Sequence, residues 1–327
     1  MPKIDELDAQ ILKALLKDGR TGYFEIANQF GVSKNKVRKR CKAMEKKGII
    51  NGATTQLNLA HLGYDALATI LISVEAQQLE ALMALVEKIT EVYTSRQYNS
   101  VYNIRAIARL KNLNELDQIK QLIKRRLPVM SLKTYIWTGV RNIPENLNLA
   151  GADKNNEGDN QVIQESVASR SDELVSIDDL DRQIIGKLTD NGRASFNKIA
   201  KELGVSTDTV VKRYHRLKEN GTLKISVQIN PKKIGYTAML DFNLAFTTPG
   251  GLSIPLVESI AKIPDVSLIL KTSGDYDLQV TAMVRDMAQS FDIQDQTAKI
   301  CGVTKIEVSE RRILEQWPTP QQYMSTF

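Results

Sequence analysis

The segment at residues 4–48 decides the fold, and it reads IDELDAQILKALLKDGRTGYFEIANQFGVSKNKVRKRCKAMEKKG. Apolar side chains recur at helical spacing over Ile4–Lys17, and Gly19 ends that pattern. A second short helix is expected at about 22–30, ending at Gly31, because a left-handed backbone costs glycine least. Ser33 is a suitable N-cap for a third helix at about 34–47. Two short helices joined by a tight glycine-containing turn predict a helix-turn-helix.

The same pattern occurs again at residues 177–221, which read IDDLDRQIIGKLTDNGRASFNKIAKELGVSTDTVVKRYHRLKENG. The two segments align without gaps at an offset of 173. Gly19-Arg20 matches Gly192-Arg193, and Gly31-Val32-Ser33 matches Gly204-Val205-Ser206. So many matches at a fixed offset indicate a duplication of one unit within the chain.

The third helix of each copy indicates the function. Residues 33–47 carry eight Lys or Arg side chains against Glu45, a net +7, whereas residues 206–220 carry four against two acids, a net +2. A helix of this diameter fits the major groove of DNA, and Lys and Arg displace counterions from phosphate. The predicted DNA-contacting residues are Ser33, Lys34, Asn35, Lys36, Arg38, Lys39, Arg40, Lys42, Ser206, Thr207, Thr209, Lys212, Arg213 and Arg216.

The second half of each unit alternates strands and helices in the order βαββαβ. This order predicts an antiparallel sheet with two helices on one face, the ferredoxin-like arrangement. The fold class is therefore α+β, with two repeats of a helix-turn-helix domain and a βαββαβ domain. The expected bounds are 1–52 and 53–141 for the first unit, 142–176 for a polar linker, and 177–223 and 224–327 for the second unit. Ala53–Leu57 and Lys224–Ile229 are expected to connect each helix-turn-helix to its sheet.

Composition narrows the function classes. The 327 residues carry a net charge of +6 and a pI near 9.1, which favours an acidic partner such as double-stranded DNA. Two cysteines and two histidines offer little for a metal site, and no cofactor is expected. No run of about 18 apolar residues predicts a membrane span, and the N-terminus has no apolar signal core. We therefore expect a cytoplasmic protein that is not an enzyme.

The combined motifs resemble the Lrp/AsnC, or feast/famine, transcription regulators. The resemblance rests on the I-D-x-L-D opening of both units, the G-V-S turns, the basic helices, and the L-G-Y and I-G-Y sites. It also rests on the turn Gly274, Asp275, Tyr276 and Asp277. It implies an amino acid or related metabolite bound at that turn and a homo-oligomer formed through the βαββαβ domains. Residues 97–103 of the first unit have neither Gly nor Asp. The doubling implies an intramolecular pseudo-dimer that reads an asymmetric operator.

Two alternatives remain at this point. The basic first helix and the altered first turn also suit an architectural DNA-binding protein without an effector. The siroheme decarboxylases resemble the same fold and are also built from paired units, but they would need histidines and arginines in the sheet region to contact a tetrapyrrole. His61 is the one histidine on the sheet side of this sequence.

Overall fold

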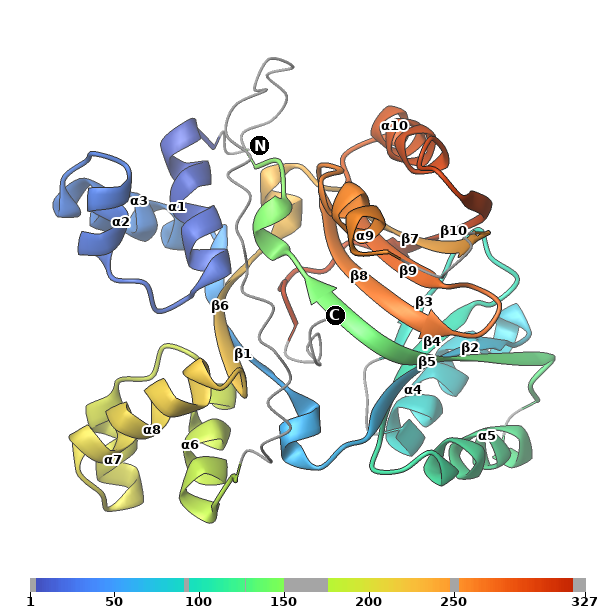
Figure 1. Cartoon of the computed structure of the whole chain (residues 1–327), viewed down its shortest axis with the longest axis horizontal. Coiled ribbons are helices and arrows are strands. Elements are labelled where there is room, and N and C mark those ends of the chain that lie inside the picture. Colours follow the sequence, from blue (N-terminus) through green and yellow to red (C-terminus); the bar gives the residue numbers. More distant parts are fainter. Residues whose placement is uncertain (1–3, 91–93, 127, 150–175, 248–252, 320–327) are drawn as a thin grey trace.

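The computed structural model describes residues 4–90, 94–126, 128–149, 176–247 and 253–319. Figure 1 shows two helical domains at one end of the molecule and a strand-rich body at the other, with a two-stranded ribbon between them. The predicted α+β architecture with two repeats is confirmed.

Each helical domain contains three helices that end where the sequence predicts. The first has α1 (Glu6–Lys17), α2 (Tyr23–Gln29) and α3 (Lys34–Lys46). The second has α6 (Asp179–Asp190), α7 (Phe196–Leu203) and α8 (Thr207–Glu219). The Ser33 and Ser206 side chains cap α3 and α8 by accepting hydrogen bonds from backbone amides. Local capping and glycine stops therefore set both helix-turn-helix motifs.

The strands that follow the helical domains pair with each other instead of joining the sheets. Strand β1 (Ile50–Leu57) runs antiparallel to β6 (Leu223–Ile229), from the Ile50–Ile229 pair to the Leu57–Leu223 pair. Both predicted connecting segments are strands that lie between a helix-turn-helix and its own sheet along the chain, and their pairing with each other was not predicted. Pairing with the other copy satisfies the strand hydrogen bonds that a lone connecting strand would leave open.

The body is one eight-stranded antiparallel sheet with the order β10-β7-β9-β8-β5-β2-β4-β3. The first unit contributes β2 (Ala66–Ser73), β3 (Thr94–Arg96), β4 (Ile104–Leu110) and β5 (Ser131–Asn142). The second contributes β7 (Ala238–Phe246), β8 (Val266–Ser273), β9 (Leu278–Val284) and β10 (Val303–Arg312). The units join in the middle of the sheet through β5 and β8. A β-bridge between Tyr98, which follows β3, and Glu310 of β10 also connects the two outer ends of the sheet.

Helices cover the outer face of each half-sheet. Helices α4 (Leu79–Thr90) and α5 (Asn114–Arg126) lie on the first half, and α9 (Ile254–Ala261) and α10 (Met287–Ala298) lie on the second. Short 3-10 turns at Leu59–Leu62, Ala76–Gln78, Pro144–Asn146 and Pro231–Ile234 connect the elements.

Each helical domain packs partly against residues of the other unit. Helix α1 packs with Val227, Ile229 and Trp317 of the second unit, whereas the second helical domain packs with Leu57 and Leu62 of the first. Each helix-turn-helix therefore depends on the other unit for part of its apolar environment. The cores around the helical domains therefore contain residues of both units, whereas the core beneath the helices of each half-sheet is formed almost entirely by one unit.

The predicted linker begins too early. Strand β5 extends to Asn142, and Leu147 and Leu149 are buried in the core around α1. Burial of these two side chains is favourable and anchors the chain after the strand. Residues 150–175 of the predicted linker lie outside the described residues.

Candidate nucleic-acid interface

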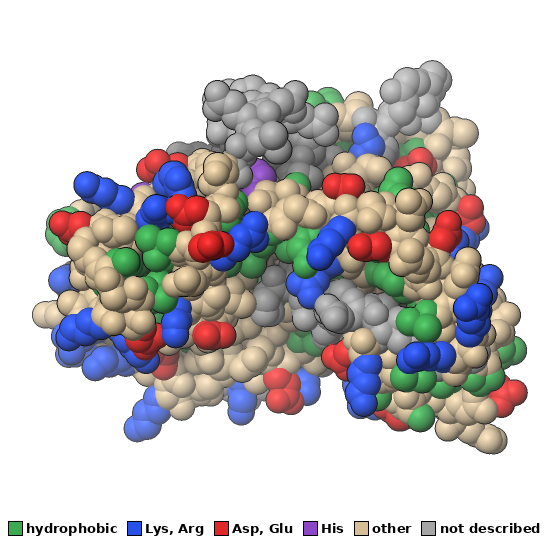
Figure 2. Space-filling view, turned by 90° about the horizontal axis from the view of Figure 1, so that it is seen from below, with side chains coloured by type: hydrophobic (Ala, Val, Ile, Leu, Met, Phe, Trp, Pro, Cys, Tyr) green, Lys and Arg blue, Asp and Glu red, His purple; other side chains and the backbone are tan. Residues whose placement is uncertain are grey.

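Helix α3 presents a strongly basic surface. Its buried side is Val37, Cys41 and Met44, with the spacing of one helix face. Seven cations of this helix and its C-cap are exposed and have no ion pair within the described part of the chain. They are Lys34, Lys36, Arg38, Lys39, Lys42, Lys46 and Lys47. Figure 2 shows Lys and Arg side chains gathered at the end of the molecule where Figure 1 places the helical domains. The amide of Asn35 and the hydroxyl of Ser33 are exposed at the start of this helix.

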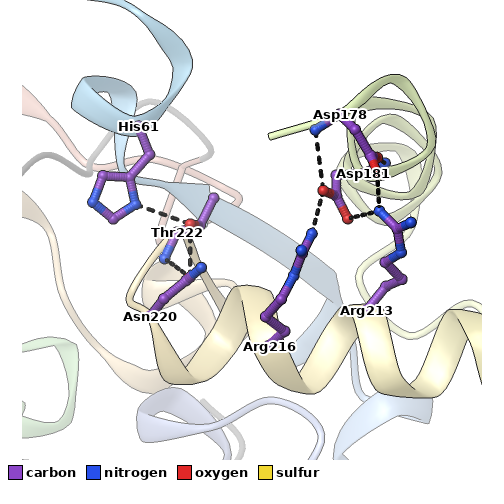
Figure 3. A network of polar contacts seen from close by, with 7 residues as sticks. All are labelled: His61, Asp178, Asp181, Arg213, Arg216, Asn220 and Thr222. Carbon is purple, nitrogen blue, oxygen red and sulfur yellow. Dashed lines mark hydrogen bonds and ion pairs between the residues drawn. The ribbon is translucent and has the colours of Figure 1, made fainter. Parts of the chain in front are cut away.

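Helix α8 uses most of its cations within the protein. Arg213 and Arg216 both pair with the carboxylate of Asp181, which is fully buried at the start of α6, as Figure 3 shows. Arg213 also pairs with Asp178, and this contact lowers the pKa of the Asp178 carboxyl to about 2. Lys218 pairs with Asp18 of the other helical domain. Among the described cations of this helix, Lys212 alone is exposed without an ion pair.

The first copy contains the equivalent internal pair. Arg40 contacts Asp5 and Asp8 at the start of α1, and Asp8 is nearly buried. Arg40, Arg213 and Arg216, which are predicted DNA contacts, also connect the third helix to the first through their guanidinium groups. Removing such a partner would leave a carboxylate buried without its counter-charge.

Three predicted polar contacts are partly used in capping. Ser33 and Ser206 accept backbone hydrogen bonds as N-caps, and Ser206 also shares a hydrogen bond with the hydroxyl of Thr209. Thr207 and Lys212 remain exposed. Helix α8 therefore offers mainly neutral polar groups to a ligand, whereas α3 offers cations.

The predicted effector turn lies at the seam between the two units. The Asp277 side chain accepts a hydrogen bond from the Phe246 amide at 2.8 Å, and the Tyr276 hydroxyl donates to Glu307. Tyr276 is fully buried, whereas Asp275 is exposed and pairs with Lys133 of β5. This contact raises the pKa of the Lys133 ammonium. Of the four predicted residues, Asp275 thus has the most exposed side chain, whereas that of Asp277 is half-buried.

The sequence did not reveal Lys133 and Tyr135 as neighbours of this turn. A Cβ on Gly274, whose φ is +149°, would lie 2.9 Å from Tyr135 Cδ1. The two side chains reach the turn because β5 of the first unit pairs with β8 of the second, and local sequence does not specify that pairing. The turn is therefore built jointly by both units.

The corresponding turn of the first unit keeps a similar hydrogen bond to the neighbouring strand. Asn99 has a φ of +52°, a left-handed value that asparagine tolerates. Asn103 makes two hydrogen bonds with the backbone of Val74, as Asp277 does once with Phe246. The first turn therefore keeps the structural contacts but has no carboxylate at the place of Asp275.

A buried polar layer fills the space between the two half-sheets. Arg311 donates to the Asp241 carboxylate, and Thr281 donates to it at 2.7 Å. Burial would raise the pKa of the Asp241 carboxyl, but Arg311, with Arg105 and the Thr281 hydroxyl, outweighs burial and holds the pKa at about 2. The adjoining cavity measures about 10 Å³, room for about one water molecule and far too small for a tetrapyrrole.

His61 is used structurally. Its Nδ1 lies 2.9 Å from the Thr222 hydroxyl, so it connects the first unit to the end of the second helical domain (Figure 3). Burial lowers the pKa of its imidazole. Among the described residues, no cluster of His, Cys, Asp and Glu has the geometry to hold a metal ion. No helix in the described ranges is both long and apolar enough to cross a membrane.

Comparisons with known proteins agree with this geometry. The AsnC-type helix-turn-helix domain matches residues 177–218, and a winged helix-turn-helix DNA-binding model matches residues 4–51. The crystal structure of the siroheme decarboxylase NirDL aligns with a TM-score of 0.58 at 17% identity, covering 98% of this chain and 95% of that one. This likeness shows that the whole-chain fold is shared.

Several proteins of Pyrococcus species match about one unit of the chain. An uncharacterised HTH-type transcriptional regulator of Pyrococcus abyssi is 31% identical over 145 residues, which are 44% of this chain and 90% of that protein. The HTH-type transcriptional regulator LrpA of Pyrococcus horikoshii is 48% identical over 88 residues, which are 27% of this chain and 60% of LrpA. The chain therefore belongs to the Lrp/AsnC family of HTH-type transcriptional regulators.

Proposed function

We propose that this chain is a sequence-specific transcription regulator that acts as an intramolecular pseudo-dimer on an asymmetric operator. The observation that carries the proposal is the unequal pair of recognition helices. The α3 surface has seven exposed cations without ion pairs in the described structure, whereas α8 has Lys212. Unpaired cations displace counterions from DNA phosphate, so α3 supplies most of the affinity and α8 contributes chiefly polar contacts.

The test is selection of bound duplexes from a random pool by the full chain, followed by affinity measurements near physiological salt. We expect enriched, non-palindromic sites bound at least about a thousandfold more tightly than bulk DNA. Equal affinity for selected and unselected duplexes would refute sequence-specific regulation. Footprints that spread from no preferred position would instead favour the architectural alternative, which the concentration of charge on α3 also suits.

We also propose that a small zwitterionic metabolite, such as an amino acid, modulates the protein at the turn formed by both units. Asp275 and Lys133 place opposite charges beside each other there, and both partly face solvent. Calorimetric titration with a panel of amino acids should detect binding that Asp275→Asn weakens. Binding that Asp275→Asn leaves unchanged would remove this turn as the effector site. Assembly of further copies through the βαββαβ domains belongs to the same proposal, and a solution mass measurement tests it.

An enzymatic role is disfavoured. The described cavity between the half-sheets admits about one water molecule, and His61 is engaged with Thr222. A visible absorption band after adding an iron tetrapyrrole to the purified protein would contradict this conclusion.

A further inference from the structure

The two helical domains touch through a pair of glycine–arginine dipeptides that occupy equivalent positions in the repeats. The Arg20 guanidinium donates from Nη1 to the Gly192 carbonyl at 2.6 Å and from Nη2 to the Ala194 carbonyl at 2.9 Å. It also lies over the Phe196 ring, with 4.1 Å between Cζ and the ring centroid. Three contacts by one side chain, all to the other domain, indicate a specific junction.

The second arginine returns the contact. Arg193 donates from Nε to the Gly19 carbonyl at 2.7 Å. Its guanidinium also acts on the Tyr23 hydroxyl, whose pKa burial raises and Arg193 lowers. Each arginine is held from behind in the same way, since its own amide donates to Asp18 or Asn191 two residues earlier. Each copy therefore contributes an arginine that contacts the other copy.

The glycines make this approach possible. A Cβ on Gly19 would lie 2.8 Å from the Ser226 carbonyl carbon, and a Cβ on Gly192 would lie 3.3 Å from Ala53. Both loops therefore lie directly on the β1–β6 ribbon, where the Gly19 amide donates to Ile225 at 2.7 Å. Because glycine has no Cβ, the loop at Gly19 can lie this close to the ribbon while its carbonyl accepts the hydrogen bond from Arg193.

We propose that Arg20 and Arg193 form a clasp, defined as these two residues with Gly19 and Gly192, that fixes the distance and angle between α3 and α8. A two-stranded ribbon alone is marginally stable, so it would not fix the two helical domains in one relative orientation. The clasp adds charge-assisted hydrogen bonds and a cation–π contact between the two domains. The arginines are positioning residues, because they act on DNA through the helices that they orient.

The effect of the clasp on DNA binding rests on the proposed function. Its structural test does not, because that test is made without DNA. Two recognition helices on one chain gain affinity only if they meet both half-sites together, and that gain depends on geometry. A fixed separation therefore selects the spacing of half-sites along the duplex. Loosening the clasp should relax the spacing preference and leave each half-site contact intact.

The structural test measures the distance between α3 and α8 without DNA. Spin labels are placed at Lys46→Cys and Glu219→Cys, both exposed, in a Cys301→Ser background, while the buried Cys41 is retained. Arg20→Gln and the milder Arg193→Gln are compared with Arg182→Gln, an exposed arginine of α6. We expect a broader distance distribution in both clasp variants and the parent distribution in Arg182→Gln. Unchanged distributions in both clasp variants would overturn the proposal.

Two further readouts separate positioning from general stability. Arg20→Lys keeps the charge but cannot donate to two carbonyls while stacking on Phe196, so we expect it to resemble Arg20→Gln. On duplexes selected by the parent, moving one half-site by about 5 bp should weaken parental binding at least roughly tenfold and variant binding by less. Equal losses in parent and variants would count against the clasp. If no duplex is preferred at all, the proposed function fails while the distance measurement still decides the clasp.

Discussion

Removing charge from α3 should weaken DNA binding far more than removing the same charge elsewhere. Lys34, Arg38 and Lys42 follow one another at intervals of four, so they form one exposed stripe on the helix. None has an ion pair within the described residues, so substitution by Gln removes charge without exposing a buried partner. The triple variant therefore isolates the contribution of this stripe to binding.

The magnitude follows from counterion release. If each cation contacts one phosphate, each contributes about 0.9 to the slope of log affinity against log salt. The triple variant should lose up to about 2.7 from that slope, which corresponds to about 500-fold in affinity at about 0.1 M salt. Fluorescence anisotropy of a labelled duplex across a salt series measures both quantities.

The control removes three cations from α5. Lys124, Arg125 and Arg126 are all exposed at its C-terminal end, on the sheet body and away from the helical domains in Figure 1. Screening limits charge effects to about 10 Å at 0.1 M salt, so this variant should bind almost as the parent does. Equal slopes for the two triple variants would show that only net charge matters and would refute the assignment of α3 as the main DNA contact.

A matched single-site comparison tests whether α8 contacts phosphate at the position equivalent to one in α3. Lys39 and Lys212 occupy equivalent positions, 173 residues apart, and both are exposed. Lys39→Gln and Lys212→Gln should each lower the salt slope by up to about 0.9 if both lysines touch phosphate. Arg213 and Arg216 are unsuitable for this purpose because their loss would leave Asp181 unpaired.

Three further predictions concern stability and reactivity. Asp181→Asn should lower the free energy of urea unfolding by about 2 kcal/mol, and Asp8→Asn should lower it by about 1 kcal/mol. The difference arises because Asp181 is fully buried and pairs with two partly exposed arginines, whereas Asp8 pairs with Arg40. A larger loss for Asp8→Asn would contradict this reasoning. The depressed pKa of Asp241 stabilises the fold above about pH 4, and about 2 kcal/mol should be lost as pH falls toward about 2, a loss absent in Asp241→Asn. A thiol reagent at neutral pH should modify exposed Cys301 only, because burial raises the pKa of the Cys41 thiol to about 11; two fast thiols would show that α3 opens readily.

Local features of the fold were predictable because short-range chemistry specifies them. The capping serines, the glycine stops and the apolar periods each act within a few residues. Helix α3 begins directly after the predicted N-cap Ser33, and α8 begins after the equivalent Ser206. The packing of each helical domain against the other unit and the β1–β6 and β5–β8 pairings were not predictable. These contacts join residues far apart in the chain, and either copy of a repeated strand could satisfy the same local pattern.

The roles of individual arginines show a finer limit. Arg38, Lys39 and Arg40 are adjacent in sequence, but the helix turns about 100° per residue, so Arg40 alone of the three reaches the first helix. One sequence signal could have revealed this. Both copies place two aspartates three residues apart at the start of the first helix and an arginine 32 residues after the second. A repeated acid–base triad of that kind indicates an internal ion pair.

The copies have diverged in the groups that face outward and agree in the groups that hold the domains together. The ion pairs behind the third helices and the glycine–arginine dipeptides are present in both units. All the exposed cations of α3 except Lys39, and the carboxylate of Asp275, have no counterpart in the other unit. Two identical chains in a symmetric dimer would have to present the same helix twice. Fusion of the copies removes that constraint, so one helix can specialise in affinity while the shared internal contacts keep the pair in register.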